Sequence, residues 1–346
     1  MDLASRILRA VCDLTETEEP AERWIRHNGR ERHNALNHCV VFLKPEILAI
    51  HDGVRVEAIL ELVLSSLRAH AVKTGAVRVL NGPYLGRHRI MEAHYGVINR
   101  VSRIGESALS QPTRKKLDAE CQGVQHRILG AHQFLEEFPE VSAFALNIIA
   151  VTLGTKKVAS GKYYSLVDVP GERIAILNPF HPYQLLHFTP PGRTIVVFEC
   201  WTNTGWNILR QQMTGATDPS RAAVGSVRRT LLERKSEFGL REVTTATNGV
   251  HCSAGPLEAM VEYCRFFSDH ANKAGIKVGE TPFGHALGRH GLSETEIVKL
   301  AKNPLLGKGG DATYAFSLTE EKNSDAAAEL LASVVLHWPA PRRVSQ

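Results

Sequence analysis

The chain has 346 residues, of which 43% are hydrophobic and 22% charged, and its formal net charge is +5. This length supports one large or two modest domains, and the composition is typical of a soluble globular protein. No apolar run reaches the roughly 18 residues of a membrane span, and the N-terminus lacks the apolar stretch of a signal peptide. No dense run of Lys and Arg favours nucleic acid as a partner. The six cysteines show no CxxC spacing, which argues against a zinc site and favours a cytoplasmic location.

The first hundred residues alternate predicted strands and helices. A charged N-terminal arm with a short amphipathic stretch, 3–14, comes first. The apolar spacing then predicts a strand at 37–43, a helix at 54–72, a strand at 76–80 and a short helix at 85–95. This order predicts an α+β sandwich in which helices pack on a sheet.

Residues from about 104 to 190 carry no recognisable catalytic spacing. They contain a predicted helix within 111–137, an apolar stretch at 144–153, a Lys/Gly/Ser-rich turn at 154–162 and a Pro-studded segment. Beyond them we predict a strand at 194–201, helices at 206–213 and 256–271, a helix or loop at 228–235, and two helical pieces at 293–301 and 325–336.

Two glycine-flanked features of the C-terminal third have plain interpretations. The run Gly307–Gly310 lacks the spacing of a phosphate-binding loop, and Asp311 would repel phosphate, so a flexible loop is expected. His285 and His290 have no third metal-binding residue at ligand spacing, so a surface loop is expected there.

His251 is the candidate nucleophile of this chain. It lies in a turn of small residues, 248–255, just before the helical run that starts at Pro256. Ser253 follows two residues later and Glu262 eleven residues later, which is about three helical turns. If the helix packs against the strand of His251, Glu262 can reach back to the ring. A histidine held in this way can act as a nucleophile, with the carboxylate setting its orientation and tautomer.

Four segments, in this order along the chain, resemble nucleoside diphosphate kinase. The first segment, 39–46 (CVVFLKPE), is similar to that family's first strand and its Lys-Pro-Asp/Asn motif, and the second, 91–95 (MEAHY), is similar to its active-site tyrosine segment. The third segment, 215–228 (GATDPSRAAVGSVR), is similar to the family's GATNP…GT(I/L)R segment. The fourth, 248–262, is similar to the segment from Asn-x-x-His-Gly-Ser-Asp through to the family's glutamate. The similarity covers about 38–100 and 193–272, roughly half of the chain. It implies a ferredoxin-like αβ sandwich with an antiparallel sheet.

The resemblance also implies a division of the chain. The expected parts are an N-terminal arm at 1–36, a first core part at 37–103, an insertion at 104–192, a second core part with the histidine at 193–272, and a C-terminal extension at 273–346. The insertion and the extension are expected to form a largely helical lobe. The family commonly forms oligomers, so a homo-oligomer is expected, with a dimer favoured by the size of these additions.

The resemblance implies a role for each matching residue. His251 would take the γ-phosphoryl group of a nucleoside triphosphate and become phosphohistidine, with Glu262 and Ser253 supporting it and Lys44 and Tyr95 beside the transferred group. The residues implied to bind the nucleotide are Thr217 and Arg228 at its phosphates, Asn248 at its sugar, and Arg210. Mg²⁺ would arrive with the triphosphate, because the site has too few carboxylates to bind it as a protein metal site. Positioning and charge neutralisation of this kind are what phosphoryl transfer requires.

Several positions depart from the family pattern. Gln211 stands where the family has a second phosphate-binding arginine, with Arg210 beside it, and Cys252 and Ala254 replace a glycine and an aspartate. Arg103 falls at the position of the base-stacking aromatic residue, where a guanidinium can also stack. Phosphate chemistry therefore looks kept and base and acceptor recognition rebuilt. Candidate contacts from the insertion are Phe180, His181, Tyr183 and His187, for each of which packing is the simpler explanation.

The sequence thus predicts a phosphotransferase that uses ATP or another nucleoside triphosphate and a small-molecule acceptor, either a nucleoside diphosphate or a specialised compound. Two alternatives are a nucleotide-binding or scaffold protein with an altered site, and nucleotidyl transfer on the same fold. Retention of His251, Lys44 and Glu262 argues against a decayed site, whereas Gln211 keeps that alternative open.

Overall fold

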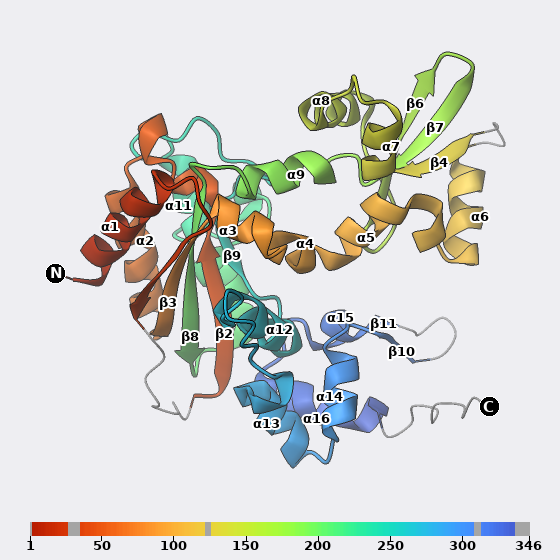
Figure 1. Cartoon of the computed structure of the whole chain (residues 1–346). Helices are drawn as coiled ribbons and strands as arrows, with labels where there is room; N and C mark the ends of the chain where they lie inside the picture. The colour runs from red at the N-terminus through yellow and green to blue at the C-terminus, as the bar shows by residue number, and fades with distance from the viewer. Residues whose placement is uncertain (1, 27–34, 122–125, 308–312, 336–346) are drawn as a thin grey trace. The chain divides into compact units, whose positions relative to one another are not determined.

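A computed structural model describes residues 2–26, 35–121, 126–307 and 313–335 (Figure 1). The chain forms two compact units, one of Met1–Tyr84 with Pro191–Gln346 and the other of Leu85–Pro190. Helix α3 (Gly82–Arg87) spans the first boundary between them. Among the described residues, no helix is both long enough and apolar enough to cross a membrane.

The first unit is built on a five-stranded sheet in the order β1-β3-β8-β2-β9. Its strands, each antiparallel to its neighbours, are β1 (Glu22–Arg26), β2 (Asn37–Leu43), β3 (Lys73–Asn81), β8 (Thr194–Thr202) and β9 (Val250–Cys252). If β1 is left out, the other four strands can be numbered 1 to 4 in chain order, as β2, β3, β8 and β9. They then lie in the sheet in the order 2-3-1-4. This is the ferredoxin-like arrangement, so the predicted α+β fold with an antiparallel sheet is confirmed.

Helices cover both faces of this sheet. On one face lie α1 (Leu3–Thr15) and α2 (Val56–Ala69), and on the other lies α12 (Pro256–Phe267), as Figure 1 shows. Every residue of β2 is buried, as a central strand with two covered faces requires. The N-terminal arm is part of this architecture, because the apolar face of α1 enters the core and β1 pairs with β3.

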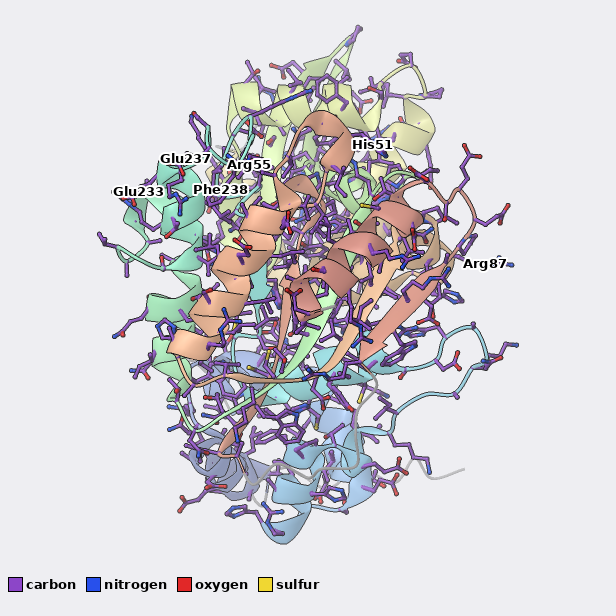
Figure 2. The ribbon with its side chains drawn as sticks, turned by 90° about the vertical axis from the view of Figure 1, so that its left-hand side faces the viewer. His51, Arg55, Arg87, Glu233, Glu237 and Phe238 are labelled. Carbon is purple, nitrogen blue, oxygen red and sulfur yellow. The ribbon has the colours of Figure 1, made fainter. Side chains whose placement is uncertain are left out.

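The short helix α11 (Val227–Glu233) leads into a segment that closes the α2 side of the core. The Arg55 N–H donates to the Phe238 carbonyl at 2.9 Å, and the Phe238 ring is buried. The Arg234 guanidinium lies 4.9 Å from the Phe238 ring centre. Figure 2 shows Arg55 beside Phe238, with Glu233 and Glu237 on the same side of the molecule. The hydrogen bond between Arg55 and Phe238 therefore holds the segment that connects α11 to β9 in place.

The C-terminal extension belongs to the same unit as the core. Its elements are α13 (Pro282–Arg289), α14 (Glu294–Leu300), β10 (Leu305–Leu306), β11 (Thr313–Tyr314), α15 (Ala315–Thr319) and α16 (Ser324–Val335). They share a hydrophobic cluster with Leu257 and Met260 of α12. The expectation that insertion and extension form one lobe is therefore wrong, because the apolar face of α12 already provides the surface on which the extension packs. Of the predicted loop Gly307–Gly310, all but Gly307 lies outside the described residues.

The second unit contains the predicted insertion together with residues 85–103. Its helices are α4 (Ile90–His94), α5 (Gly96–Ile104), α6 (Gln111–Glu120), α7 (Ala131–Glu137), α8 (Ala143–Leu153) and α9 (His181–Phe188). Its strands, in the sheet order β4-β7-β6-β5, are β4 (Arg127–Gly130), β5 (Lys156–Ala159), β6 (Lys162–Val169) and β7 (Glu172–Leu177). Helices predominate, as expected, but the sheet was not predicted. Its strand β5 lies within the expected turn, because only Ser160 and Gly161, the latter with φ +66°, are needed for the tight connection to β6.

The predicted helix at 206–213 changes its hydrogen-bond period after one turn. Helix α10 (Trp206–Ile208) continues as a π-helical turn, Leu209–Thr214, in which the Gly215 N–H donates to the Arg210 carbonyl five residues back. Such wide turns are rare and often occur at functional sites. Arg210 and Gln211 both lie in this π-helical turn, which determines the direction in which their side chains leave the backbone.

Candidate functional site

His251 projects from the edge strand β9 toward helix α12. It pairs with Phe42 across the sheet, and the two rings stack with their centres 4.5 Å apart. The His251 Nε2 atom lies 2.7 Å from Oε1 of Glu262, whose side chain is fully buried, whereas 20% of the His251 side chain is exposed. The strand, the Phe42 ring and the carboxylate together fix the orientation of the imidazole.

Both oxygens of Glu262 are hydrogen-bonded inside the protein. While Oε1 faces His251, Oε2 accepts a hydrogen bond of 2.5 Å from the Ser253 hydroxyl. Ser253 is itself fixed, because its Oγ accepts the Val40 N–H at 3.0 Å. A carboxylate held in this way accepts the Nε2–H of His251, and in the neutral ring this leaves the lone pair on Nδ1.

Sequence reasoning missed a second carboxylate beside this group. Glu258 lies four residues before Glu262 on α12, so both project from the same helix face. Its Oε2 accepts the Ala254 N–H at 2.6 Å. Burial, and then the negative charge of Glu262, raise the pKa of Glu258 to about 7. The i, i+4 spacing of two glutamates after the histidine was the signal that identifies this pair.

The loop before His251 is locked to the end of β2. Gly249 has a φ of +76°, and a Cβ atom there would lie 2.6 Å from Leu231 and 2.9 Å from Ile47. The Lys44 N–H donates to the Gly249 carbonyl, and the Gly249 N–H donates to Glu46 Oε1, both at 2.8 Å. Only glycine suits this position, and its contacts bring Lys44 next to the histidine strand.

Asn248 joins Lys44 to the loop that carries Thr217. The Lys44 Nζ donates to Asn248 Oδ1 at 2.7 Å, and Asn248 Nδ2 donates to the carbonyls of Thr217 at 3.0 Å and Thr245 at 3.2 Å. Asn248 is buried, and burial also lowers the pKa of Lys44. The structure thus gives Asn248 a supporting role for the lysine, and its contact with a sugar stays a prediction.

Arg228 contacts the main chain on both sides of the site. Its Nη2 donates to the Val250 carbonyl and its Nη1 to the Gly215 carbonyl, each at 2.8 Å. Burial, with the nearby Arg210 charge contributing, lowers the Arg228 pKa to about 10. In the described part of the chain, neither Lys44 nor Arg228 forms an ion pair with a carboxylate. Two partly buried cations that form no ion pair among the described residues favour the binding of an anion.

Arg210 and Gln211 both contact the C-terminal extension. Arg210 Nη2 lies 3.3 Å from Glu320 Oε1, and Gln211 Nε2 donates to Glu321 Oε1 at 2.7 Å. The Glu321 N–H in turn donates to the Ala254 carbonyl at 2.9 Å, directly after the Ser253 position. The extension therefore supplies the counter-ions of Arg210, which no sequence motif indicated.

Tyr95 and Arg103 belong to the second unit, so their positions relative to His251 stay predictions. Tyr95 follows α4 and contacts the ring of Phe188, 6.1 Å between centres. Arg103 forms an ion pair with Glu92 at 3.0 Å, which engages the guanidinium within its own unit. Among the residues proposed to contact a substrate, His181 is fully buried in the unit, which supports the packing interpretation for it.

Cys252, which follows the histidine, is an interior thiol. It is buried on the opposite face of β9 from His251, in the core cluster that also contains Cys39. Its close contact with the Cys39 thiol, together with burial, raises the pKa of Cys252 well above its usual range. The thiol therefore stays neutral, and a reactive thiolate is not expected.

Comparison with known proteins gives distant likenesses to solved structures. No protein-family model matches this chain, and no curated protein matches it. Among solved structures, nucleoside diphosphate kinase from Encephalitozoon cuniculi, an apo structure in a cubic crystal form, is similar with a TM-score of 0.33 and 11% sequence identity. The aligned region covers 67% of this chain and 90% of that chain.

Proposed function

We propose that this protein is a phosphotransferase that carries a phosphoryl group on His251. The observation that supports the proposal most strongly is the pairing of His251 Nε2 with the buried Glu262 at 2.7 Å. The residues on either side of this pair add weight, because Lys44 and Arg228 supply positive charge that the described residues leave without carboxylate partners. A nucleophile held in a fixed orientation beside cations that can neutralise phosphate charge is what transfer of a phosphoryl group requires.

In the proposed first half-reaction, the lone pair on His251 Nδ1 attacks the γ-phosphorus of a nucleoside triphosphate. A phosphorus–nitrogen bond forms, the bond from the γ-phosphorus to its bridging oxygen breaks, and the nucleoside diphosphate leaves with the electron pair. The Nε2 proton stays in place, and Glu262 balances the positive charge that the ring acquires. In the second half-reaction, an acceptor phosphate oxygen attacks the phosphorus and the bond to Nδ1 breaks.

Mg²⁺ is expected to enter with the triphosphate as part of the substrate. Three carboxylates of the described site, those of Glu262, Glu258 and Glu46, already accept hydrogen bonds from protein groups. The proposal therefore treats Mg²⁺ as part of the substrate and assigns no step to a resident ion.

The experiment is covalent labelling with ATP that carries ³²P at the γ-position. The parent protein should acquire label that is labile in acid and stable in alkali, and His251→Ala should acquire none. His285→Ala, an exposed histidine on α13, is the matched control and should label like the parent. Discharge of the label by nucleoside diphosphates then tests the acceptor class.

A parallel arm with ³²P at the α-position separates the alternatives. Label from this nucleotide on the protein or on the acceptor would replace phosphoryl transfer with nucleotidyl transfer. Binding of ATP without any label in either arm would overturn the proposal in favour of a nucleotide-binding protein.

A further inference from the structure

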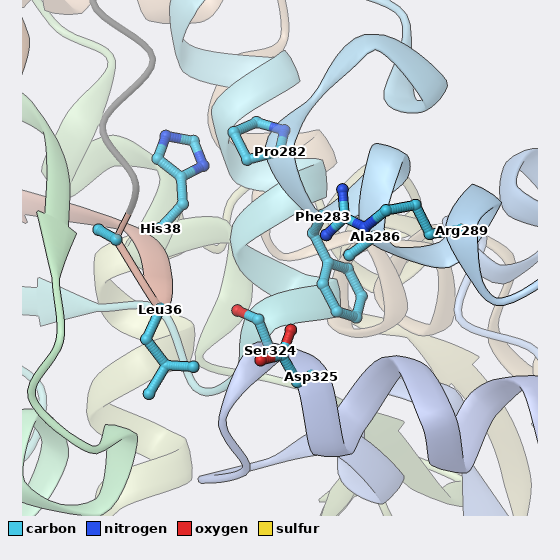
Figure 3. A pocket seen from close by; sticks show the side chains of 9 residues that line it. Leu36, His38, Pro282, Phe283, Ala286, Arg289, Ser324 and Asp325 are labelled. Atoms are coloured by element: carbon cyan, nitrogen blue, oxygen red, sulfur yellow. The ribbon is translucent and has the colours of Figure 1, made fainter.

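A cavity lies in the first unit, at the start of strand β2. Its volume is about 320 Å³, within the lower range of small-molecule sites. It is enclosed by the residues before and in β2 and by helices α13 and α16 (Figure 3). Its lining residues are Ala35, Leu36, His38, Pro282, Phe283, Ala286, Arg289, Ser324 and Asp325.

One of the lining residues, His38, belongs to a second histidine–glutamate pair. His38 Nε2 lies 3.1 Å from Oε1 of Glu199, and both side chains are almost completely buried. The second oxygen of Glu199 accepts the Ala76 N–H at 2.8 Å. The His38 ring also lies against Trp201 and Tyr263, with centres 4.2 Å and 4.8 Å away. A buried polar pair of this kind is costly unless it is fully hydrogen-bonded.

The remaining nitrogen of His38 has no hydrogen-bond partner among the residues that the structure describes. With Nε2–H directed at Glu199, the neutral ring carries its lone pair on Nδ1. Only 6% of the surface of His38 is exposed, yet His38 lines the cavity. Its Nδ1 is therefore an acceptor that a small molecule in the cavity can reach.

The walls supply one charge of each sign and an apolar surface. Arg289 on α13 and Asp325 on α16 are exposed at the cavity, and among the described residues they form no ion pair with each other. Figure 3 shows both side chains beside the ring of Phe283. The wall is rigid where β2 meets α16, because Asn37 Oδ1 accepts the Ser324 N–H at 3.0 Å.

We propose that this cavity binds a small zwitterion with an apolar side chain, that is, an apolar α-amino acid. Its carboxylate would pair with Arg289, its ammonium group would donate to Asp325 and to His38 Nδ1, and its side chain would pack on Phe283 and Leu36. The lining carries no net charge apart from the imidazole, unlike the cations beside His251. A nucleotide would find only one guanidinium opposed by a carboxylate, so a zwitterion fits better.

This site is distinct from the one proposed at His251 and does not depend on it. His38 and Phe42 lie four residues apart on the same face of β2, which corresponds to about 13 Å along the strand. The helix α12 touches both places, because Glu262 contacts His251 and the next residue, Tyr263, contacts His38.

Calorimetric titration of the full chain with L-leucine and with L-phenylalanine tests the proposal. At least one should bind, and 4-methylpentanoate and 3-methylbutylamine, which each lack one charged group, should bind at least about tenfold more weakly than leucine. Arg289→Gln and Asp325→Asn should each raise the dissociation constant of the amino acid by a similar factor. Lys277→Gln, an exposed cation of the extension whose side chain is 70% exposed, is the matched control and should leave it unchanged.

A second measurement addresses His38 directly. In protein labelled with ¹⁵N-histidine, saturating amino acid should shift the Nδ1 resonance of His38, which His38→Gln identifies by its loss. Because Arg289 and Asp325 are exposed, their variants keep the test valid even if His38→Gln fails to fold. Absence of binding at millimolar amino acid, equal binding of the singly charged analogues, or binding unaffected by both charge variants would each overturn the proposal.

Discussion

In the proposed reaction, Glu262 acts on His251 through its charge as well as its position. Glu262→Gln preserves the size of the side chain and an oxygen for the His251 bond, but it removes the charge that would balance the phosphorylated ring. We expect the rate of labelling from γ-labelled ATP to fall by about 100-fold or more, measured by rapid quench in a single turnover. An unchanged rate, with the variant folded by circular dichroism, would show that Glu262 is only a packing residue.

Glu258 should make the stability of the first unit depend on pH. Its pKa is about 7 in the folded protein and 4.5 ordinarily, so the folded state binds the proton more tightly. This contribution is complete below about pH 4.5 and is lost as the pH rises towards 7. Glu258→Gln has no carboxyl group to ionise, so its free energy of unfolding does not fall in this way. Above pH 7 the variant should be more stable than the parent by on the order of 1–3 kcal/mol, and at pH 4.5 the difference should be much smaller.

Urea unfolding of both proteins at several pH values measures this difference. If the difference in free energy of unfolding between variant and parent does not change with pH, the shifted pKa of Glu258 is contradicted. The comparison of two proteins that differ at one position cancels the titration of the groups that do not interact with Glu258.

At the scale of elements, the C-terminal extension is packed onto the loop after His251. At Gly255, an added Cβ would lie 2.4 Å from the Thr319 carbonyl oxygen, which is backbone and has little freedom to move. We expect Gly255→Ala to destabilise the protein by about 1–3 kcal/mol, and also to slow labelling of His251. Gly288→Ala is the control, because nothing lies within 4 Å of its added Cβ. Equal melting temperatures for the two variants would contradict this packing.

The same extension neutralises Arg210 with two carboxylates. If Glu320 and Glu321 compete with an anionic ligand for this guanidinium, the double variant E320Q/E321Q should bind ATP more tightly. The side chains are 47% and 30% exposed, and exposed ion pairs contribute about 0.2–1 kcal/mol, so we expect a change of about 1.5- to 5-fold in the dissociation constant. Weaker binding would mean that the glutamates instead hold Arg210 in its binding position.

At the scale of the whole molecule, the second unit should be the more sensitive to acid. Burial, followed by the nearby charge of Arg103, lowers the pKa of His132 to about 4 from 6.5, and burial also lowers that of His181. Unfolding therefore takes up protons, and stability is lost as the pH falls from about 6.5 towards 4. Hydrogen exchange in peptides from 85–190 should accelerate over this range, and less so in His132→Asn.

Tryptophan fluorescence provides the comparison for the first unit. All four tryptophans lie outside residues 85–190, so this signal reports on the other unit alone. Fluorescence and exchange that change together at every pH would contradict a separate acid transition of the second unit.

The local features of the sequence were sufficient to predict an α+β sandwich, and the resemblance to a known family added its ferredoxin-like arrangement. The apolar run 37–43 is a strand because both of its faces are covered, and the His251–Glu262 spacing anticipated a helix that returns its carboxylate to the ring. Both are short-range patterns, in which the period of apolar residues and the pitch of a helix carry the information.

Only the tertiary structure decided which side chains complete the two sites. Glu320 reaches Arg210 and Glu321 reaches Gln211, each from 110 residues away, and Glu199 reaches His38 from 161 residues away. The sheet of the second unit was missed for a similar reason, since the four-residue strand β4 is stabilised by parallel pairing with β7, about 45 residues later. Such contacts depend on how distant elements pack, and the local periodicity of a single sequence contains no signal for that packing.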